Sequence, residues 1–450
     1  MFGIPLTRIG VFALAAGWLA TPCPGQPPLS LAPAPLVQED AAPARPPTDN
    51  PPGYFDVPAA GSLAGFSPED ARFTSGFPDP RRYDVGLDLV NAPVFDGGLI
   101  LYGRDIAMKI GGFVKADFIY DFNPIDSTDQ FDTTTIPIGA APRTNARFHA
   151  KQTRLSFDTR WVSNHRRIRI FVSGDFFTNN MGLEDGRFRL RRAFGESTHL
   201  LVGKTFTTFT DVAAAPETLD FEGSVSAVNR RQALARWRQN LWSPDVVGAI
   251  AVEDTRFIII PPPLVPGVAR TPSPDIVSRI RLSKDWGQFQ IANVIRVGGF
   301  QPLGQDMVTG MGWGLNFTGV VPVQPRQTKL YYQIVFGKGI GSYRGLPDFA
   351  PSSLTEGQLV PMFGWMVGAT HAWTPRLSSN LTYAENVLDN PAFQEPDEVH
   401  RTTYLAANLI HSPMERVDIG IEYLYGLKEN VGREIGTAHR IQVAFIFTLP

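Results

Sequence analysis

Arginines that alternate with apolar residues are the side chains of this chain with the clearest chemical potential. Ile168 lies between Arg167 and Arg169, and Leu190 separates the next pair of arginines in the same way. The cations that share this pattern are Arg154, Arg160, Arg167, Arg169, Arg189, Arg191, Arg236, Arg279 and Arg281. Rows of guanidinium groups along a channel favour anions. The pattern therefore predicts a cationic surface that selects solutes by charge.

The motifs of the common enzyme classes are missing from the sequence. The seven histidines are scattered singly, without metal-ligand spacing, and no Gly-x-Ser-x-Gly elbow or P-loop occurs. Carboxylate pairs such as Glu184-Asp185 have no neighbouring nucleophile or base. We therefore predict no enzyme activity, no metal and no cofactor. The formal net charge of −2 also argues against a nucleic-acid partner, because such proteins carry a basic surplus.

The segment that best defines the positioning elements is 106–122, with the sequence IAMKIGGFVKADFIYDF. Its even positions are apolar or glycine, whereas its odd positions include Lys109, Lys115, Asp117 and Asp121. Period-two alternation indicates a β-strand, because successive side chains point to opposite faces. This strand is long compared with the usual length of about 5–6 residues. One apolar and one charged face over this length are typical of a transmembrane barrel strand.

Similar segments recur along the chain and predict the fold class. We count about 16 of them, within the range of bacterial outer-membrane barrels. The connections alternate between short turns, such as Asp285–Gly287, and long loops, such as 254–274, 338–360 and 427–438. A soluble β-sandwich has no reason to alternate in this way. We therefore predict an all-β, transmembrane antiparallel β-barrel of about 16 strands.

The alternation also assigns individual side chains to the two faces of the barrel wall. Leu315 and Phe317 should face lipid, whereas Asn316 should face the lumen, where an arginine would be tolerated. Arg192 interrupts the pattern of its strand, and we interpret it as a side chain that snorkels at a membrane edge.

Three parts can be distinguished along the chain. Residues 1–25 combine Arg8, a short apolar run and a proline-rich end, which predicts a secretory signal peptide. Residues 26–98 begin with a stretch rich in proline and alanine and are predicted to form a largely disordered periplasmic segment. Residues 99–450 contain the barrel. With Cys23 as the single cysteine, no intrachain disulfide can form.

Several stretches resemble the DcaP-like outer-membrane porins, mainly within residues 105–240. They are KIGGFVK at 109–115, KQTRLSFD at 151–158, Asp175–Phe177, Arg189–Gly195, GKTFTTFTD at 203–211 and PETLDFEG at 216–223. The resemblance implies a 16-stranded homotrimeric channel whose third long connection folds into the pore. The proline-rich N-terminal part lacks the heptads of the family's stalk, and Thr448–Pro450 follow the terminal aromatic residue that is usual in such proteins.

The third long connection, 211–229, is acidic. Its carboxylates Asp211, Glu217, Asp220 and Glu222 should therefore stand opposite the arginines and complete the constriction. We predict a passive outer-membrane porin for small hydrophilic solutes that prefers anions such as dicarboxylates, with outer-membrane lipid as its surroundings. A phosphate- or carbohydrate-selective porin is the first alternative. A secreted soluble β-rich binding protein is an alternative of a different class.

Overall fold

The structure is a computed structural model that describes residues 99–102, 106–163, 166–178, 187–261, 265–324 and 327–449. All of these belong to one structural unit, Pro52–Pro450. The predicted signal peptide and the predicted disordered segment, 1–25 and 26–98, lie outside the described residues. No helix among the described residues is long and apolar enough to cross a membrane.

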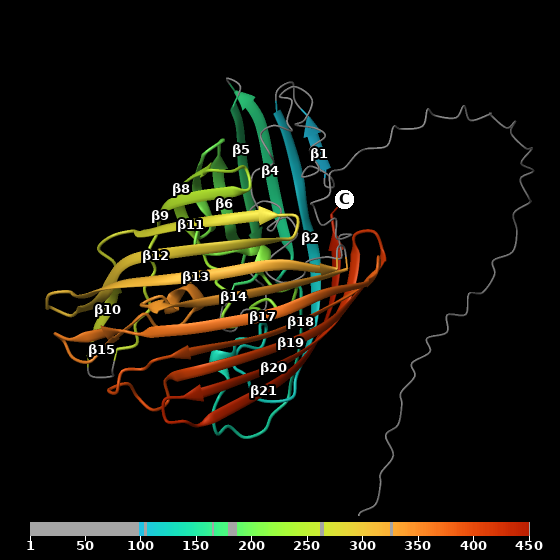
Figure 1. The fold of residues 1–450 in the computed structure, drawn as a ribbon. Helices are drawn as coiled ribbons and strands as arrows, with labels where there is room; N and C mark the ends of the chain where they lie inside the picture. Colours follow the sequence, from blue (N-terminus) through green and yellow to red (C-terminus); the bar gives the residue numbers. More distant parts are fainter. Residues whose placement is uncertain are drawn as a thin grey trace, which may run out of the picture. The chain divides into compact units, whose positions relative to one another are not determined.

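Sixteen strands of the described chain pair antiparallel in a closed ring, because β2, the first strand of the ring, pairs with both β4 and the last strand, β21. Figure 1 shows β11 to β14 and β17 to β21 side by side. The ring consists of β2 (Ile106–Asp121), β4 (Arg154–Ser163), β5 (Arg166–Asp175), β6 (Arg189–Glu196), β7 (Leu200–Phe206), β8 (Arg231–Asn240), β9 (Val246–Glu253), β11 (Asp275–Lys284), β12 (Gly287–Pro302), β13 (Val308–Gln324), β14 (Thr328–Lys338), β17 (Pro361–Thr374), β18 (Leu377–Leu388), β19 (Val399–Met414), β20 (Val417–Asn430) and β21 (Ile435–Thr448). The predicted barrel is confirmed.

Shorter elements extend this ring or lie in its connections. β1 (Leu99–Tyr102) and β3 (Asn145–His149) pair with parts of β2, and β10 (Gly267–Arg270) pairs with the end of β12. β15 (Phe349–Pro351) and β16 (Gly357–Leu359) form a separate two-stranded sheet. Three 3-10 turns are η3 (Thr133–Thr135), η4 (Val212–Ala214) and η5 (Gly341–Arg344).

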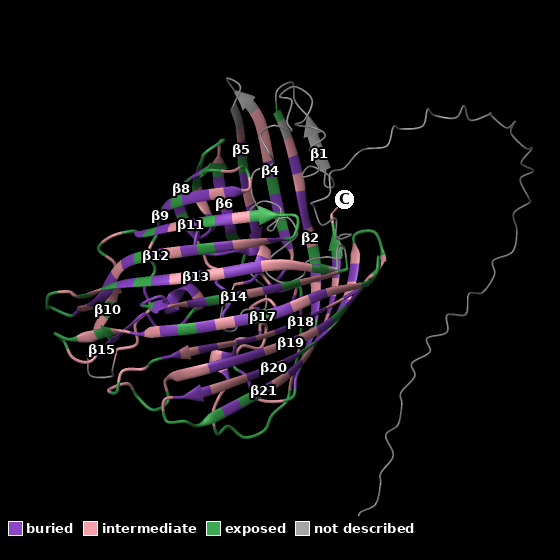
Figure 2. Ribbon diagram, viewed as in Figure 1, coloured by how far each residue is buried: buried purple, intermediate pink, exposed green. Residues whose placement is uncertain are grey.

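The two faces of the wall differ as the alternation predicts. On β12, Ile291 is 53% exposed on the outer face, whereas its neighbours Gln290 and Ala292 are each 1% exposed on the inner face. Figure 2 shows this banding of buried and exposed residues along the long strands. Phe118 on β2 and Leu381 on β18 are also large, apolar and exposed. Contiguous apolar surface of this kind is rare on soluble monomers and is expected where a wall meets lipid.

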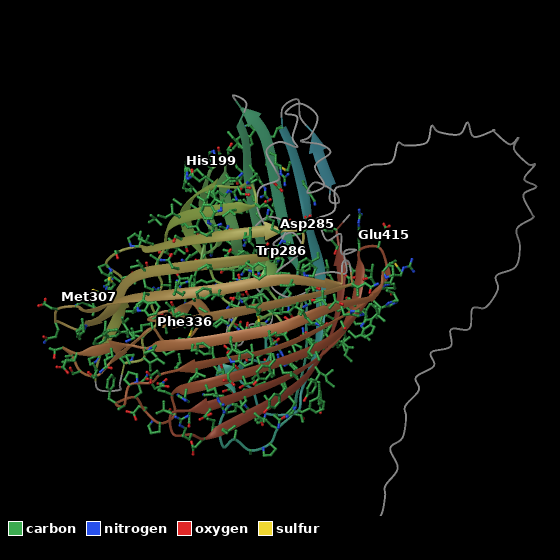
Figure 3. The ribbon with its side chains drawn as sticks, in the orientation of Figure 1. His199, Asp285, Trp286, Met307, Phe336 and Glu415 are labelled. Carbon is green, nitrogen blue, oxygen red and sulfur yellow. The ribbon has the colours of Figure 1, made fainter. Side chains whose placement is uncertain are left out.

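Short turns and longer connections alternate around much of the ring. Asp285 and Trp286 join β11 to β12, and Glu415 belongs to the turn between β19 and β20 (Figure 3). The predicted long loop at 427–438 is wrong. Strand β20 extends to Asn430 and β21 begins at Ile435, so only four residues, 431–434, connect the two strands. The additional residue pairs at this end of β20 and β21 include Lys428 with Gly436 and Glu429 with Ile435. Along these residues, apolar and polar side chains do not alternate. Their sequence therefore lacks the alternation by which we assigned strands.

Several connections fold into the barrel and fill part of its interior. Phe131 of the first connection packs in one cluster with Val225 of the third connection and with Tyr404 and Leu424 of the wall. A second cluster joins Phe209 of the third long connection to residues 339–360, the connection between β14 and β17 that includes η5. It also includes residues on the inner faces of β11, β12, β14 and β17. The interior is therefore narrowed by ordered segments.

Candidate functional site: an arginine cluster on the inner wall

Arg160 of β4 and Arg169 of β5 lie on the inner face and bind carboxylates of the same wall. Asp158 accepts hydrogen bonds from both Arg160 and Arg169, at 2.7–3.1 Å. Arg169 also donates to Glu196 of β6, at 2.8 Å. The pairing register sets Arg160 opposite Arg169, so that a carboxylate between them offsets their repulsion. This part of the wall is largely neutralised.

A carboxylate of β5, Asp175, binds two arginines of β6 in the same way. Asp175 accepts two hydrogen bonds from Arg189, at 2.9 and 3.0 Å, and a further one from Arg191. Arg154 stands opposite Asp175 in the register and lies over the ring of Phe113, 5.2 Å from its centroid. Arg167 is on β5, but its side chain lies outside the described part of the structure.

The interpretation of Arg192 as a snorkelling residue is wrong. A register shift between Ser173 and Gly174 turns both Arg191 and Arg192 inward. Arg192 is 2% exposed, and its guanidinium lies 4.3 Å from the centroid of Phe171. A β-bulge places two consecutive side chains on one face, which period-two counting cannot anticipate.

Four arginines of β8 and β11 converge on the inner face, and we call Arg236, Arg238, Arg279 and Arg281 the arginine cluster. The strand between them, β9, contributes small side chains. Ala249 stands opposite both Arg238 and Arg279 in the two registers. Arg236, Arg238 and Arg281 are all close enough to repel Arg279 electrostatically. The small residues of β9 leave room for these long side chains to approach one another.

The partners of the arginine cluster differ from those of β4 to β6. Arg238 pairs with Glu196 and Arg281 pairs with Asp211, at 2.8 and 2.7 Å. Arg236, by contrast, donates to the Thr208 hydroxyl and the Phe206 carbonyl. Arg279 donates to the amide oxygen of Gln290. Neutral acceptors satisfy a guanidinium group without cancelling its charge.

The third connection, residues 207–230, lies inside the barrel, and we call it the inward loop. Its first carboxylate, Asp211, is held by Arg281, Gln288 and Thr318. Glu217 pairs with Lys329 of β14. These contacts fix the loop against β11 to β14.

The other two carboxylates of the inward loop do not face the arginines of β4 to β6. Asp220 accepts from the backbone amides of Phe131 and Gly223, both at 2.8 Å. Complete burial raises the pKa of the Asp220 carboxyl above its usual range. Glu222 pairs with Arg344 of η5. Of the four predicted carboxylates, Asp211 therefore meets an arginine of the predicted set, whereas Glu217, Asp220 and Glu222 have other partners.

The charges of this half of the inner wall do not balance. Ten described arginines line the inner faces of β4 to β11: Arg154, Arg160, Arg169, Arg189, Arg191, Arg192, Arg236, Arg238, Arg279 and Arg281. The carboxylates of the same faces and of the adjoining part of the inward loop are six: Asp158, Asp175, Glu196, Asp211, Glu253 and Asp275. The difference is four positive charges, and two of these belong to Arg236 and Arg279, whose hydrogen-bond acceptors are neutral.

Three residues of this site were missed from the sequence. Arg192 was assigned to the wrong face, and Arg238 was not included among the cations, although it alternates with Trp237 as Arg236 does. Gln290 has no charge and therefore offered no sign of its role. Among the described residues, no group of three or more histidine, cysteine or acidic side chains could hold a metal ion.

Comparison with known proteins agrees with this architecture. No protein-family model matches the sequence, and no curated protein matches it either. Among solved structures, the outer membrane channel DcaP of Acinetobacter baumannii is similar with a TM-score of 0.71 and 19% identity, over 78% of this chain and 100% of that one. OmpF of Salmonella typhi in complex with daunomycin has a TM-score of 0.50 and 8% identity, over 78% and 100%. The predicted likeness is confirmed at the level of the fold: the described residues between 99 and 449 form a 16-stranded barrel similar to that of the DcaP channel.

Proposed function

We propose that this protein is a passive diffusion channel of the outer membrane that prefers small hydrophilic anions, including dicarboxylates. One observation carries the anion preference, namely the surplus of positive charge at the arginine cluster. The acceptors of Arg236 and Arg279 are a hydroxyl, a carbonyl and an amide, so no hydrogen-bonded carboxylate cancels either charge. Unbalanced charges in a narrow channel with low-dielectric walls have focused fields.

The outer surface supports the proposed membrane location. Exposed apolar side chains such as Val114, Ile280 and Ile421 alternate with buried polar ones on strands around the ring. A secreted soluble protein would place this surface in water at a large cost in free energy. The homotrimer remains a prediction from the family resemblance.

The proposal is tested with the purified protein in a planar lipid bilayer. We expect stepwise conductance and, across a potassium chloride gradient, a reversal potential of the sign that corresponds to chloride permeation. Raising the salt concentration should reduce this preference, because salt screens the charges of the pore. Conductance with equal permeability to both ions would refute the anion preference, and absence of conductance from folded protein would refute the channel.

A further inference from the structure

Gln290 of β12 joins two members of the arginine cluster to the inward loop. Its amide oxygen accepts from Nη2 and Nε of Arg281, at 2.8 and 3.2 Å, and from Nη1 of Arg279, at 3.4 Å. Its amide nitrogen donates to the carbonyl of Thr210, at 3.2 Å. The side chain is 1% exposed, and its residue stands opposite Arg281 in the register. These four hydrogen bonds connect the cluster to the loop.

The cluster needs such a contact because its members repel one another. Arg279 is within electrostatic range of Arg281, Arg236 and Arg238, and the attraction of Asp211 offsets only part of their repulsion. An arginine side chain also has about 2 kcal/mol of rotamer entropy, which favours disorder over one fixed position. A single oxygen that accepts from two guanidinium groups holds both in one place.

The chemical type of the acceptor is as important as its position. On β4 to β6 the acceptors that gather arginines are Asp158, Asp175 and Glu196, and each of them cancels a positive charge. Gln290 performs the same geometric task with a neutral group. Gln290 itself therefore cancels no charge, and because Arg281 is paired with Asp211, the positive charge that remains without a hydrogen-bonded carboxylate is that of Arg279.

We propose that Gln290 is a positioning residue that fixes Arg279 and Arg281 and thereby sets the strength of the anion preference, an inference that rests on the proposed function. A carboxylate at this position would order both cations and also cancel one positive charge, whereas the neutral amide of Gln290 orders them and leaves the charge of Arg279 in place. The residue touches the arginines and the loop, and it acts on permeating ions only through them.

The test compares Gln290→Leu with a matched control, Gln333→Leu. Gln333 is buried on the inner face of β14 and donates to the carbonyl of Ser226, so it also tethers the inward loop, but it bonds no arginine. Reversal potentials of both variants are measured in bilayers at 0.1 M and 1 M salt, after folding has been checked by circular dichroism. Loss of one hydrogen bond of about 0.5–1.5 kcal/mol corresponds to roughly two- to tenfold. We expect the chloride-to-potassium permeability ratio of Gln290→Leu to fall within that range at low salt, and that of Gln333→Leu to be unchanged.

A third variant, Gln290→Glu, separates this inference from the proposed function. The carboxylate can still accept from both arginines, but it cancels one positive charge, so the anion preference should fall at least as far as in Gln290→Leu. If Gln290→Glu lowers the preference and Gln290→Leu does not, the cluster senses ions without help from Gln290 and the positioning role is refuted. Equal losses in Gln290→Leu and Gln333→Leu would also refute it, because a loop tether would explain both. An anion preference unaffected even by Gln290→Glu would refute the cluster as the selective element.

Discussion

Removal of the two charges with neutral acceptors is the sharpest perturbation of the proposed pore. In the double variant Arg236→Gln, Arg279→Gln, each guanidinium group is replaced by an amide that keeps some hydrogen bonding. The carboxylates of the wall keep their ion pairs with Arg169, Arg238 and Arg281. The variant thus removes two positive charges without breaking any of these ion pairs.

The size of the effect follows from Coulomb's law. A unit charge roughly 6 Å from a monovalent anion contributes about 0.7 kcal/mol in water. With a Debye length of about 10 Å at 0.1 M salt, two such charges contribute approximately 0.8 kcal/mol, and with about 3 Å at 1 M approximately 0.2 kcal/mol. The same charges disfavour potassium by an equal amount, so the free-energy difference between the two ions is twice these values. We expect the chloride-to-potassium permeability ratio to fall roughly 15-fold at 0.1 M and about twofold at 1 M.

The assay is the reversal potential in planar bilayers at both salt concentrations. The matched control is Lys284→Gln, Arg376→Gln, which removes two positive charges from exposed positions at the short-turn end of the barrel. This control should leave the permeability ratio almost unchanged. The reasoning is refuted if the arginine variant folds but keeps its ratio at 0.1 M, or if the control lowers the ratio as much.

Three further predictions concern the stability of the barrel. Ile291→Arg, on the outer face of β12, should lower the free energy of unfolding in lipid by about 2–4 kcal/mol, measured by urea titration. Leu303→Arg, in the exposed connection between β12 and β13, should have little effect. Equal losses of stability in the two variants would contradict a lipid-facing β12. Arg296→Met should cost about 3–5 kcal/mol, because Asp275 and Asp348 would lose their buried cation, and an unchanged unfolding midpoint would contradict that pairing. Burial raises the pKa of Asp348 to about 6, so the folded state binds a proton that the unfolded state releases, and stability should rise as the pH falls from 7 to 5. Asp348→Asn should reduce this pH dependence in urea titrations, and an identical pH profile would exclude Asp348 as its source.

The face of each strand residue could be predicted from the sequence because the barrel wall is a single β-sheet. Lipid on one side and the pore on the other impose opposite polarities, so alternation indicates both the strand and its orientation. The segment 106–122 was predicted as one long strand and is observed as Ile106–Asp121. The rule failed where the backbone departed from regular pairing at Arg192, and where strands continue without alternation beyond Tyr425.

Asn316 shows that a correctly predicted face of the barrel wall does not reveal what a side chain contacts. It faces inward, as predicted, but it is 0% exposed and donates to the carbonyl of Phe209 in the inward loop. An arginine at this position would have to displace the loop, so we no longer expect the substitution to be tolerated. The loop approaches from 107 residues away, and local periodicity carries no information about it.

The sequence by itself determined the all-β class, the number of strands to a close approximation, and the sign of the charges on the inner wall. These properties depend on short-range alternation and on composition, which any stretch of about ten residues displays. Only the tertiary structure decided which charges cancel, since Coulomb energy depends on the distance between groups. Asp211 meets Arg281 across 70 residues and Glu222 meets Arg344 across 122, whereas Arg279 meets the neutral Gln290. The surplus at the arginine cluster is therefore a property of the closed barrel and its inward loop.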